Sequence, residues 1–403
     1  TRLPLAIVER IRAAVDPKFI IMFRLSMLDL VDGGSEWPEV VSLAQGLEAS
    51  GADIINTGIG WHEARVPTIA TCVPRGGFSW VTQKLKREGL GVPLVATNRI
   101  NTPEVAEAIL ANGHSDLISM ARPFLADPFL LTKAQQGKPE RINTCIACNQ
   151  ACLDHTFQAR IASCLVNPRA GYETELKAPE EVPTTMPQAL AVVGAGPAGL
   201  AFATIAARRG HRVTLYDASP KIGGQFNLAK RVPGKEEFYE TLRYFAHELV
   251  EAGVDVRLNT RVDAATLAAS GVDKVVLATG VTPRRLHIEG EDHASVLSYV
   301  EVLTRAKPVG DRVAIIGAGG IGFDVGEFLA HRADSLPPPP PPKAQSAVAD
   351  LLGGMEELQP WTELSTPAFL SHWGIDGTNT TRGGLLAAPE GGGAAAKQAT
   401  PTD

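Results

Sequence analysis

The stretch ALAVVGAGPAGL, residues 189–200, decides the fold of the central part of the chain. Its apolar residues 189–193 predict a buried strand, and its glycines in a G-x-G-x-x-G pattern predict a tight turn into a helix at 200–209. A second strand is predicted at 212–216 and ends at Asp217. Such glycines let a pyrophosphate approach the helix N-terminus, and a carboxylate after the second strand binds a ribose hydroxyl. Because these parts occur in order, the sequence predicts a Rossmann-like dinucleotide-binding unit.

Two further turns belong to this unit. Gly223-Gly224-Gln225 follows the acidic residue, and a strand predicted at 274–278 leads to the turn Thr279-Gly280. Glycines at these turns bring the backbone close to the expected nucleotide. The residues predicted to contact the dinucleotide are Gly194, Gly196, Ala198, Gly199, Asp217, Gly224, Gln225, Thr279 and Gly280.

A second glycine motif follows a strand predicted at 313–316 and precedes a helix predicted to run to His331. Its three glycines are Gly317, Gly319 and Gly322. Two such motifs predict two dinucleotides, most simply one flavin and one nicotinamide. The alternative is a degenerate structural repeat.

The composition changes after this motif. Residues 337–342 are consecutive prolines, which favour an extended and solvated chain. The strand that would select between NAD and NADP does not follow the second motif. We therefore expect an incomplete FAD/NAD(P)-binding region at 188–334 and a proline-rich, largely disordered tail at 335–403.

Upstream of the first glycine motif, four of the five cysteines form a C-x2-C-x3-C-x11-C pattern. They are Cys145, Cys148, Cys152 and Cys164. Four thiolates spaced this closely, with a later fourth, favour an iron–sulfur cluster. Zinc usually takes two separate C-x2-C pairs or cysteines with histidines, and cysteines two or three residues apart form disulfides poorly. We expect a cluster segment at 141–172 and a polar linker at 173–187, with zinc and disulfides as the alternatives.

Strand and helix alternate four times in residues 1–140. Apolar strands are predicted at 19–25, 52–57, 93–97 and 116–120, and helices at 5–14, 40–50, 81–88 and 102–111. This alternation predicts parallel βα units. Four units make either a small doubly wound sheet or half of a (β/α)8 barrel. Chemically active residues after each strand favour the barrel, because the active sites of barrels lie at that end.

Three arginines are predicted at these strand ends, namely Arg24, Arg99 and Arg122. A guanidinium binds phosphate in bidentate fashion, so together they favour a phosphorylated cofactor. His62 follows a glycine-rich strand end, where it is either a proton or hydrogen-bond donor or an ordinary loop histidine. Cys72 is predicted to be a buried small residue.

Composition excludes several classes of protein. The chain has 403 residues, 44% of them hydrophobic, and a net charge of −6 without a basic stripe, so nucleic acid is not an expected partner. No apolar run has the length of a membrane span. With no signal-peptide pattern and few cysteines outside one motif, we expect a cytoplasmic protein. Because the chain starts at Thr1 within a helical pattern, we expect a fragment, and no pattern indicates its oligomeric state.

With the motifs placed, the chain resembles the bacterial NADPH-dependent 2,4-dienoyl-CoA reductases, in the old-yellow-enzyme-like group that includes trimethylamine dehydrogenase. The similarity runs over about residues 1–331. The segments that carry it are GIGWHEARVPTIAT (58–71), ATNRINTPEVAE (96–107), MARPFLADP (120–128), NTCIACNQACLDHTF (143–157), SCLVNPRA (163–170) and VVGAGPAGL (192–200).

The resemblance implies the C-terminal half of an FMN-binding TIM barrel at 1–140, followed by the Rossmann-like region. It implies FMN contacts from Arg24, Arg99, Ala121 and Arg122, substrate contacts from His62, Glu63, Ala64 and Arg65, and a protonation role for His62. It further implies a [4Fe–4S] cluster on the four cysteines, FAD at the first glycine motif and NADPH at the second. The implied reaction reduces 2,4-dienoyl-CoA thioesters in unsaturated fatty acid β-oxidation, with electrons passing from NADPH through FAD, cluster and FMN.

Two features depart from that family. Its histidine pairs with a tyrosine from an earlier strand, whereas the first tyrosine of this chain is Tyr172. The segment FLSHWGIDGTNTTRGGL, residues 369–385, resembles a family segment that returns after an unrelated proline-rich insertion. A related enoate reductase or amine dehydrogenase, or an inactive fragment, are the alternative functions.

Overall fold

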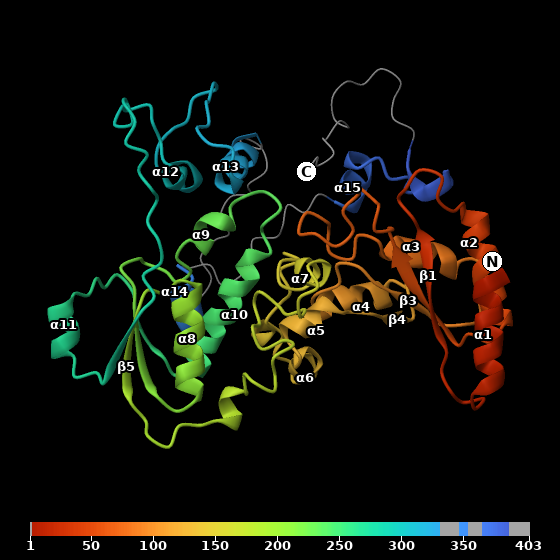
Figure 1. Ribbon diagram of the computed structural model, residues 1–403, viewed down its shortest axis with the longest axis horizontal. Helices are drawn as coiled ribbons and strands as arrows, with labels where there is room; N and C mark the ends of the chain where they lie inside the picture. Colours follow the sequence, from red (N-terminus) through yellow and green to blue (C-terminus); the bar gives the residue numbers. More distant parts are fainter. Residues whose placement is uncertain (1, 331–345, 354–364, 387–403) are drawn as a thin grey trace.

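The computed structural model describes residues 2–330, 346–353 and 365–386. They form two four-stranded parallel sheets, each with its own hydrophobic core. Figure 1 shows the first sheet and its helices in red and orange on one side and the second in green on the other, with α7 (Leu153–Phe157) between them. The chain is therefore α/β, as predicted.

The first sheet consists of β1 (Met22–Leu28), β2 (Ile54–Ile59), β3 (Leu94–Ala96) and β4 (Leu117–Ile118), in that order and all parallel. All four predicted strands are present, but their bounds differ. The first begins three residues later than predicted: Phe19 lies in a bend, Ile20 precedes the strand, and the two side chains are 57% and 64% exposed. The order confirms the alternation of parallel βα units that the sequence predicted.

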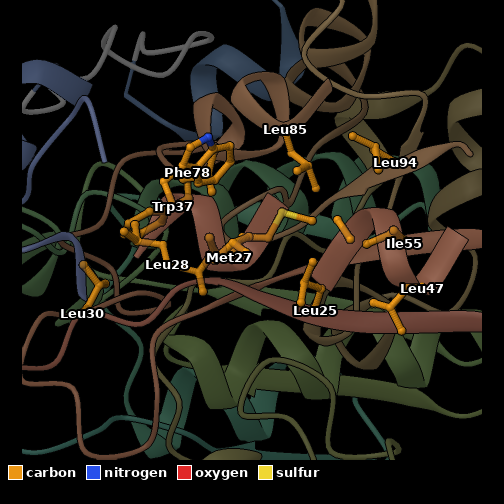
Figure 2. Packing of buried hydrophobic residues seen from close by; sticks show 14 of the residues in the cluster. Leu25, Met27, Leu28, Leu30, Trp37, Leu47, Ile55, Phe78, Leu85 and Leu94 are labelled. Atoms are coloured by element: carbon orange, nitrogen blue, oxygen red, sulfur yellow. The ribbon is translucent and has the colours of Figure 1, made fainter. Parts of the chain in front are cut away.

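Helices cover one face of this sheet. They are α1 (Arg2–Ala14), α2 (Trp37–Ala49), α3 (Ser79–Lys86) and α4 (Pro103–Ala111), and two short helices, α5 (Arg122–Ala126) and α6 (Leu130–Gln135), follow β4 in the chain. Side chains alternate along a strand, so Leu25 and Met27 of β1 point into the core that Figure 2 shows, with Leu47 from α2 and Leu85 from α3. On the opposite face of β1, Arg24 is exposed.

The second sheet has the order β7-β6-β5-β8, with β5 (Ala189–Val193), β6 (Arg212–Tyr216), β7 (Asp255–Arg257) and β8 (Lys274–Leu277). The strands β5 and β6 have the predicted bounds. The helices of this domain are α8 (Pro197–Arg208), α9 (Phe226–Ala229), α10 (Phe238–Glu251) and α11 (Ala264–Ala269). Leu200 of α8 and Leu249 of α10 are fully buried between these helices and the sheet.

Residues 313–316, predicted as the strand of the second glycine motif, do not form one. Ile315 and Ile316 are 44% and 70% exposed, since no strand among the described residues pairs with this segment. Two helices, α12 (Tyr299–Thr304) and α13 (Gly320–Ala330), form a small core with Val232 instead. His331, the predicted end of the helix, lies outside the described residues.

The tail was predicted to be largely disordered, and two parts of it lie among the described residues. Within it the structure describes α14 (Ala347–Leu351), α15 (Thr366–His372) and the short turn η3 (Arg382–Gly384). Leu351 packs into the core of the second domain, whereas Phe369 and Ile375 are buried in the core of the first. Figure 1 shows α15 in blue beside the helices of the first sheet. The prolines at 337–342 lie outside the described residues.

Short turns connect the two domains. They are η1 (Pro139–Arg141) and η2 (Pro179–Glu181), which lie on either side of α7. In the part of the chain that the structure describes, no helix combines the length and the apolarity that crossing a membrane requires.

Candidate functional site

The four cysteines of the predicted cluster segment line one pocket. Cys145, Cys148, Cys152 and Cys164 surround it together with Arg122 and Asn149. Cys145 is buried, the other three are half-buried, and none is in a disulfide. The pocket lies in the segment between the two domains, which brings together the residues that the sequence grouped by spacing alone.

Burial raises the pKa of the thiols of Cys145, Cys148 and Cys164, to about 11 for Cys164. The guanidinium of Arg122 acts in the opposite direction on Cys145. In the metal-free chain these thiols are therefore protonated at neutral pH. Binding of a soft metal centre would release the protons, because the thiolate is the ligand.

The backbone of the cysteine loop is strongly turned. Ala147 and Asn149, on either side of Cys148, adopt the left-handed conformation with φ of 53° and 60°. The amide of Ser163 donates to the carbonyl of Ala151 at 2.7 Å, which draws the fourth cysteine toward the first three. Turns of this kind make four cysteines from a single short segment face the same space.

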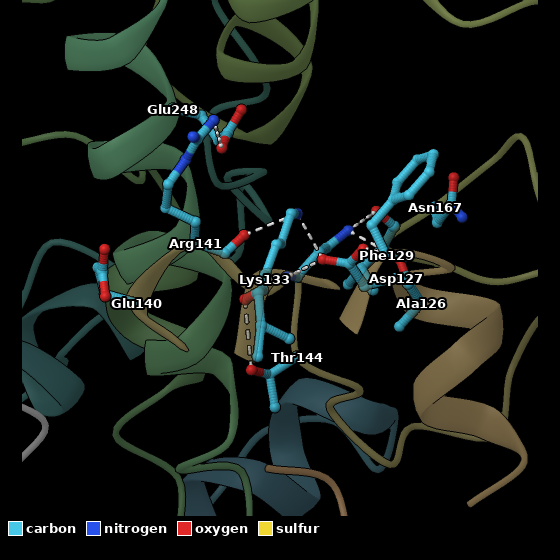
Figure 3. Close-up of polar contacts among 12 residues, drawn as sticks. Ala126, Asp127, Phe129, Lys133, Glu140, Arg141, Thr144, Asn167 and Glu248 are labelled. Atoms are coloured by element: carbon cyan, nitrogen blue, oxygen red, sulfur yellow. Dashed lines mark hydrogen bonds and ion pairs between the residues drawn. The ribbon is translucent and has the colours of Figure 1, made fainter. Parts of the chain in front are cut away.

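Polar contacts fix both ends of the loop to the first domain. The carboxylate of Asp127 accepts from the amide of Asn143 at 2.8 Å and from Lys133 Nζ at 2.6 Å. The side chain of Asn143 donates to the carbonyl of Val166 at 2.8 Å, two residues after Cys164. Figure 3 shows Asp127 and Lys133 in this network, with Arg141 reaching Glu248 of α10. The cysteine loop is thus held in place by side chains outside it.

The four cysteines could serve as ligands of an iron–sulfur cluster or of a zinc ion. Among residues 2–330, 346–353 and 365–386, no three His, Cys, Asp or Glu side chains converge closely enough to hold one metal ion. A zinc ion needs four ligands at roughly 2.0–2.3 Å from one point. In an iron–sulfur cluster each iron would take one of the four cysteines that line the pocket. The iron–sulfur assignment stays a prediction.

The arginines predicted at strand ends lie in different places. Arg24 is the third residue of β1, so it lies within the strand and the prediction that it follows the strand was wrong. Its neighbour across the ladder, Asn56, has a buried side-chain oxygen without a hydrogen-bond partner. Both face away from the covering helices, where an exposed cation and an unpaired acceptor suit a polar ligand such as a flavin ring.

Ala121 and Arg122 begin α5 and lie beside the cysteine loop. Arg122 Nη1 donates to the carbonyl of Ile69 at 2.9 Å and to Asn149 Oδ1 at 2.5 Å. Its guanidinium also lines the cysteine pocket. Arg122 therefore joins the strand-end face, where FMN is predicted, to the predicted cluster.

Arg99 is buried and already paired. Its Nη2 donates to Glu237 Oε1 at 2.5 Å and its Nε to the carbonyl of Val73 at 2.8 Å. The backbone of Arg99 has a φ of 55°, which turns the chain sharply after β3. Because a carboxylate occupies one edge of the guanidinium, the predicted phosphate contact of Arg99 has only part of its donors free.

His62 lies on the exposed loop after β2. Its ring contacts Phe157 of α7 edge-on, with 6.0 Å between the ring centroids. The other predicted substrate contacts, Glu63, Ala64 and Arg65, follow it on the same loop. The loop is anchored where Trp61 Nε1 donates to Asp29 at 2.8 Å. The predicted catalytic histidine is thus next to the cysteine segment.

The first glycine motif has the turn that dinucleotide binding requires. Gly194 has a φ of 109°, and a Cβ there would lie 2.3 Å from the carbonyl oxygen of Ala278. A Cβ on Gly199 would lie 1.8 Å from the carbonyl oxygen of Gly194. A Cβ on Gly196 would meet no atom within 4 Å, and Ala198 is exposed in the first turn of α8. Two glycines therefore serve the packing, whereas Gly196 leaves open space where a pyrophosphate is expected.

The remaining predicted contacts surround this turn. The carboxylate of Asp217 accepts from the amide of Ala195 at 2.6 Å, so it orders the turn as well as facing the expected ribose. A Cβ on Gly224 would lie 3.1 Å from Gly196 Cα. Gln225 donates to the carbonyl of Val281 at 2.9 Å, close to the exposed turn of Thr279 and Gly280. The structure therefore brings the predicted residues of the first motif together.

The second motif keeps only its local turn. Gly317 has a φ of 112°, and a Cβ on Gly322 would lie 2.3 Å from the Gly317 carbonyl oxygen, while Gly319 is open. This is the geometry of the first motif without a strand leading into it. NADPH binding by Gly317, Gly319 and Gly322 stays a prediction.

Two groups of buried polar residues were not predicted from the sequence. Asp29 lies directly after β1, is 2% exposed and positions the loop of His62. The sequence pattern that could have identified it is a carboxylate between two leucines at the end of a strand. Glu237 and Asn101 are buried between the domains, 136 residues apart in the chain. No local pattern identifies such a pair, because each residue alone is typical of a surface.

Comparisons with known proteins agree with this architecture. Residues 1–141 match the model of the NADH:flavin oxidoreductase / NADH oxidase family, and residues 188–336 match that of the pyridine nucleotide-disulphide oxidoreductases. The first 141 residues are thus a partial barrel region, and a Rossmann-like domain follows.

Similar proteins share both domains. A metal reductase of Desulforamulus reducens is 38% identical over 330 residues, which are 81% of this chain and 49% of that protein. A cinnamate reductase of Clostridium sporogenes is 31% identical over 303 residues, 73% of this chain and 44% of the relative. A solved complex of 2-naphthoyl-CoA reductase with 2-naphthoyl-CoA has a TM-score of 0.80 at 35% identity, covering 82% of this chain and 50% of that one. The chain spans about half the length of the relatives it matches.

Proposed function

The chain joins a partial domain of the NADH:flavin oxidoreductase / NADH oxidase family to a pyridine nucleotide-disulphide oxidoreductase domain, and from this premise we propose that it acts as an NADPH-dependent reductase of 2,4-dienoyl-CoA thioesters. The observation that carries the proposal is the pocket lined by four cysteines and Arg122 between the two domains. A redox centre at this position suits an enzyme with one cofactor on each side.

The geometry of the described residues supports the proposed cofactor contacts. The four cysteines would bind a [4Fe–4S] cluster, Arg24, Ala121 and Arg122 would contact FMN, and the first glycine motif with Asp217 would bind FAD. Nicotinamide supplies electron pairs, a cluster carries single electrons and flavins convert between the two, which is the chemistry these groups bring when bound. Gly317, Gly319 and Gly322 are the proposed NADPH contacts.

The proposed substrate contacts lie on the loop 62–65. His62 would hold a hydrogen bond to the thioester carbonyl oxygen and help to protonate the product, and Glu63 and Arg65 would orient the substrate. The thioester class is supported by the similarity to the 2-naphthoyl-CoA reductase. Residues 1–171 contain no tyrosine that would serve as a second proton donor.

A second candidate is an enoate reductase, because a cinnamate reductase is among the relatives. Both candidates reduce a C=C bond next to a carbonyl, and they differ in whether the carbonyl belongs to a thioester or a free acid. A related amine dehydrogenase remains a third alternative.

The experiment has a cofactor arm and a substrate arm. The chain is purified anaerobically and loaded with iron and sulfide, and its iron, acid-labile sulfide, zinc and flavin are measured. NADPH oxidation is then followed with 2,4-decadienoyl-CoA, cinnamate or sarcosine.

We expect about four iron atoms per chain, absorbance that dithionite bleaches, and faster NADPH oxidation with the dienoyl thioester than with the acid or the amine. Thiols that hold zinc, or stay free after loading, would overturn the cluster assignment. Turnover with cinnamate alone would favour the enoate reductase.

A further inference from the structure

Glu237 extends from the second domain into the first. It is the residue before α10, and its side chain is completely buried. All the partners of its carboxylate come from the first domain. Glu237 therefore lies at the junction of the domains, beside the cysteine segment.

Both oxygens of this carboxylate are occupied. Oε1 accepts from Arg75 Nε at 2.9 Å and from Arg99 Nη2 at 2.5 Å, and Oε2 accepts from Arg75 Nη2 at 2.5 Å. Glu240, one turn along α10, accepts from Arg75 at 2.8 Å and from Arg243 at 2.7 Å. Three guanidinium groups thus face two carboxylates in a buried network, in which charge-assisted hydrogen bonds are strong.

Asn101 connects this network to the first cysteine. Its Nδ2 donates to Glu237 Oε1 at 3.2 Å and to the backbone carbonyl of Cys145 at 3.0 Å. Asn101 is 2% exposed, so water does not replace these partners. From the same helix α10, Arg243 donates to the carbonyl of Ile142 at 2.9 Å and to Thr144 Oγ1 at 3.0 Å.

Glu237 is ionised at neutral pH. Burial on its own would raise the pKa of its carboxyl, but Arg99 and Arg75 outweigh burial and lower it below the ordinary value. A permanent negative charge is therefore fixed next to the cysteine pocket. It orients the amide of Asn101, whose donor group must face the carboxylate and the Cys145 carbonyl together.

We propose that Glu237 is a positioning residue. Through Asn101 it fixes the backbone of Cys145, and through Arg99 it fixes the turn after β3. The packing of the two domains at this junction therefore sets the shape of the cysteine pocket. The positioning of the cysteine loop by Glu237 concerns the protein alone. The expectation that the same contacts also tune a bound metal centre rests on the proposed function.

Two variants test the proposal, with one control. Glu237→Gln removes the charge and keeps the size, and Asn101→Ala removes only the connecting amide. Glu251→Gln is the control, because Glu251 lies on the same helix and contacts the same segment through Arg141 at 3.0 Å but is 53% exposed.

The metal-free arm measures hydrogen–deuterium exchange of a peptide covering residues 141–149. We expect exchange about tenfold faster in Glu237→Gln and in Asn101→Ala, equivalent to about 1.4 kcal/mol of local opening free energy, and little change in the control. A double variant that is no faster than either single variant would show that the two residues act together.

The metal-loaded arm measures release of iron to a chelator and the midpoint potential of the cluster. We expect faster release in both variants and a more positive midpoint in Glu237→Gln, because a negative charge has gone; a purely structural role would leave the midpoint unchanged.

Wild-type exchange in both folded variants would overturn the positioning role, whatever the metal arm gives. If Glu237→Gln does not fold, Asn101→Ala decides. If the wild type takes up no iron, the proposed function fails, while the exchange arm still tests the role of Glu237.

Discussion

At the scale of single residues, the glycine turn after β5 separates the requirements of folding from those of binding. A Cβ on Gly199 would lie 1.8 Å from a carbonyl oxygen, whereas one on Gly196 would meet nothing within 4 Å. We expect Gly199→Ala to lower the free energy of unfolding by about 1–3 kcal/mol or more, because α8 must move away from the turn. Urea unfolding of the purified variant measures this loss.

The matched variant Gly196→Ala, three residues earlier in the same motif, is expected to affect flavin binding rather than stability. Gly196→Ala keeps wild-type stability but fills the space expected for a pyrophosphate, so we expect its flavin content to fall at least tenfold. Flavin fluorescence after denaturation provides the measurement. Normal flavin content in a folded Gly196→Ala protein would contradict the assignment of the first motif.

The cysteines allow a similar comparison. Cys148 lines the pocket, whereas Cys72 is exposed on a separate loop, contrary to its predicted burial. We expect Cys148→Ser to lose most of the iron after reconstitution, because a hydroxyl is a poor ligand for iron in a cluster. Cys72→Ser should keep wild-type iron, and an equal loss in both variants would indicate nonspecific binding.

These residues show how far local pattern predicts a site. The cysteine pocket and the first glycine turn were predictable, because each is built from one short segment whose spacing fixes its geometry. The ion pair of Arg99 with Glu237 was not, because its partner is 138 residues away and belongs to another domain. Sequence spacing contains no signal for a contact of that kind.

At the scale of elements, α15 shows that a segment far along the chain completes the first core. Phe369 is fully buried, and its ring meets Phe78 edge-on at 6.0 Å between centroids. We expect Phe369→Ala to lower the free energy of unfolding of the first domain by about 3–5 kcal/mol. Leu386→Ala, at a side chain that is 52% exposed, is the control and should cost about 0.5 kcal/mol. Equal unfolding midpoints for both variants would show that α15 is not part of this core.

Gly383 explains why the residues after α15 dock so closely. A Cβ on Gly383 would lie 2.0 Å from the carbonyl oxygen of Val31. The amide of Leu30 also donates to the Gly383 carbonyl at 2.9 Å, which fixes the segment to the loop after β1. The proline run and small polar residues around this segment dominated its composition, so disorder was the expectation from sequence.

The second glycine motif shows the opposite error. Its apolar residues 313–316 have the composition of a buried strand, and the turn that follows has the expected φ. A parallel strand forms only where a neighbouring strand provides hydrogen bonds, and among the described residues no such neighbour is adjacent. Periodicity predicts the character of a strand but not the presence of its partner.

At the scale of the whole molecule, the order of the domains was predictable and their junction was not. Alternating strands and helices predicted the first sheet, and the motif order predicted the second domain and the cysteine segment between them. The junction is formed by buried and half-buried charges from both domains, including Arg75, Arg141, Glu237, Glu240 and Glu248. In sequence, such residues are indistinguishable from a solvated surface.

This junction makes the molecule sensitive to acid. The pKa of Glu237 in the folded protein is below its ordinary value of 4.5, because Arg99 and Arg75 outweigh the effect of burial. A lowered folded-state pKa stabilises the fold fully above the unfolded-state pKa, and this stabilisation is lost as the pH falls through the folded-state pKa. Protonation then leaves Arg99 buried without its counter-charge and leaves Arg75 paired with Glu240.

We therefore expect the wild type to lose the stability that this carboxylate contributes as the pH falls from neutral to strongly acidic values. Glu237→Gln should be less stable than the wild type at neutral pH and should approach it as the pH falls below about 4, since neither protein then has the charge. Urea unfolding at a series of pH values measures both curves. Parallel curves for the two proteins would show that Glu237 does not contribute to the acid sensitivity.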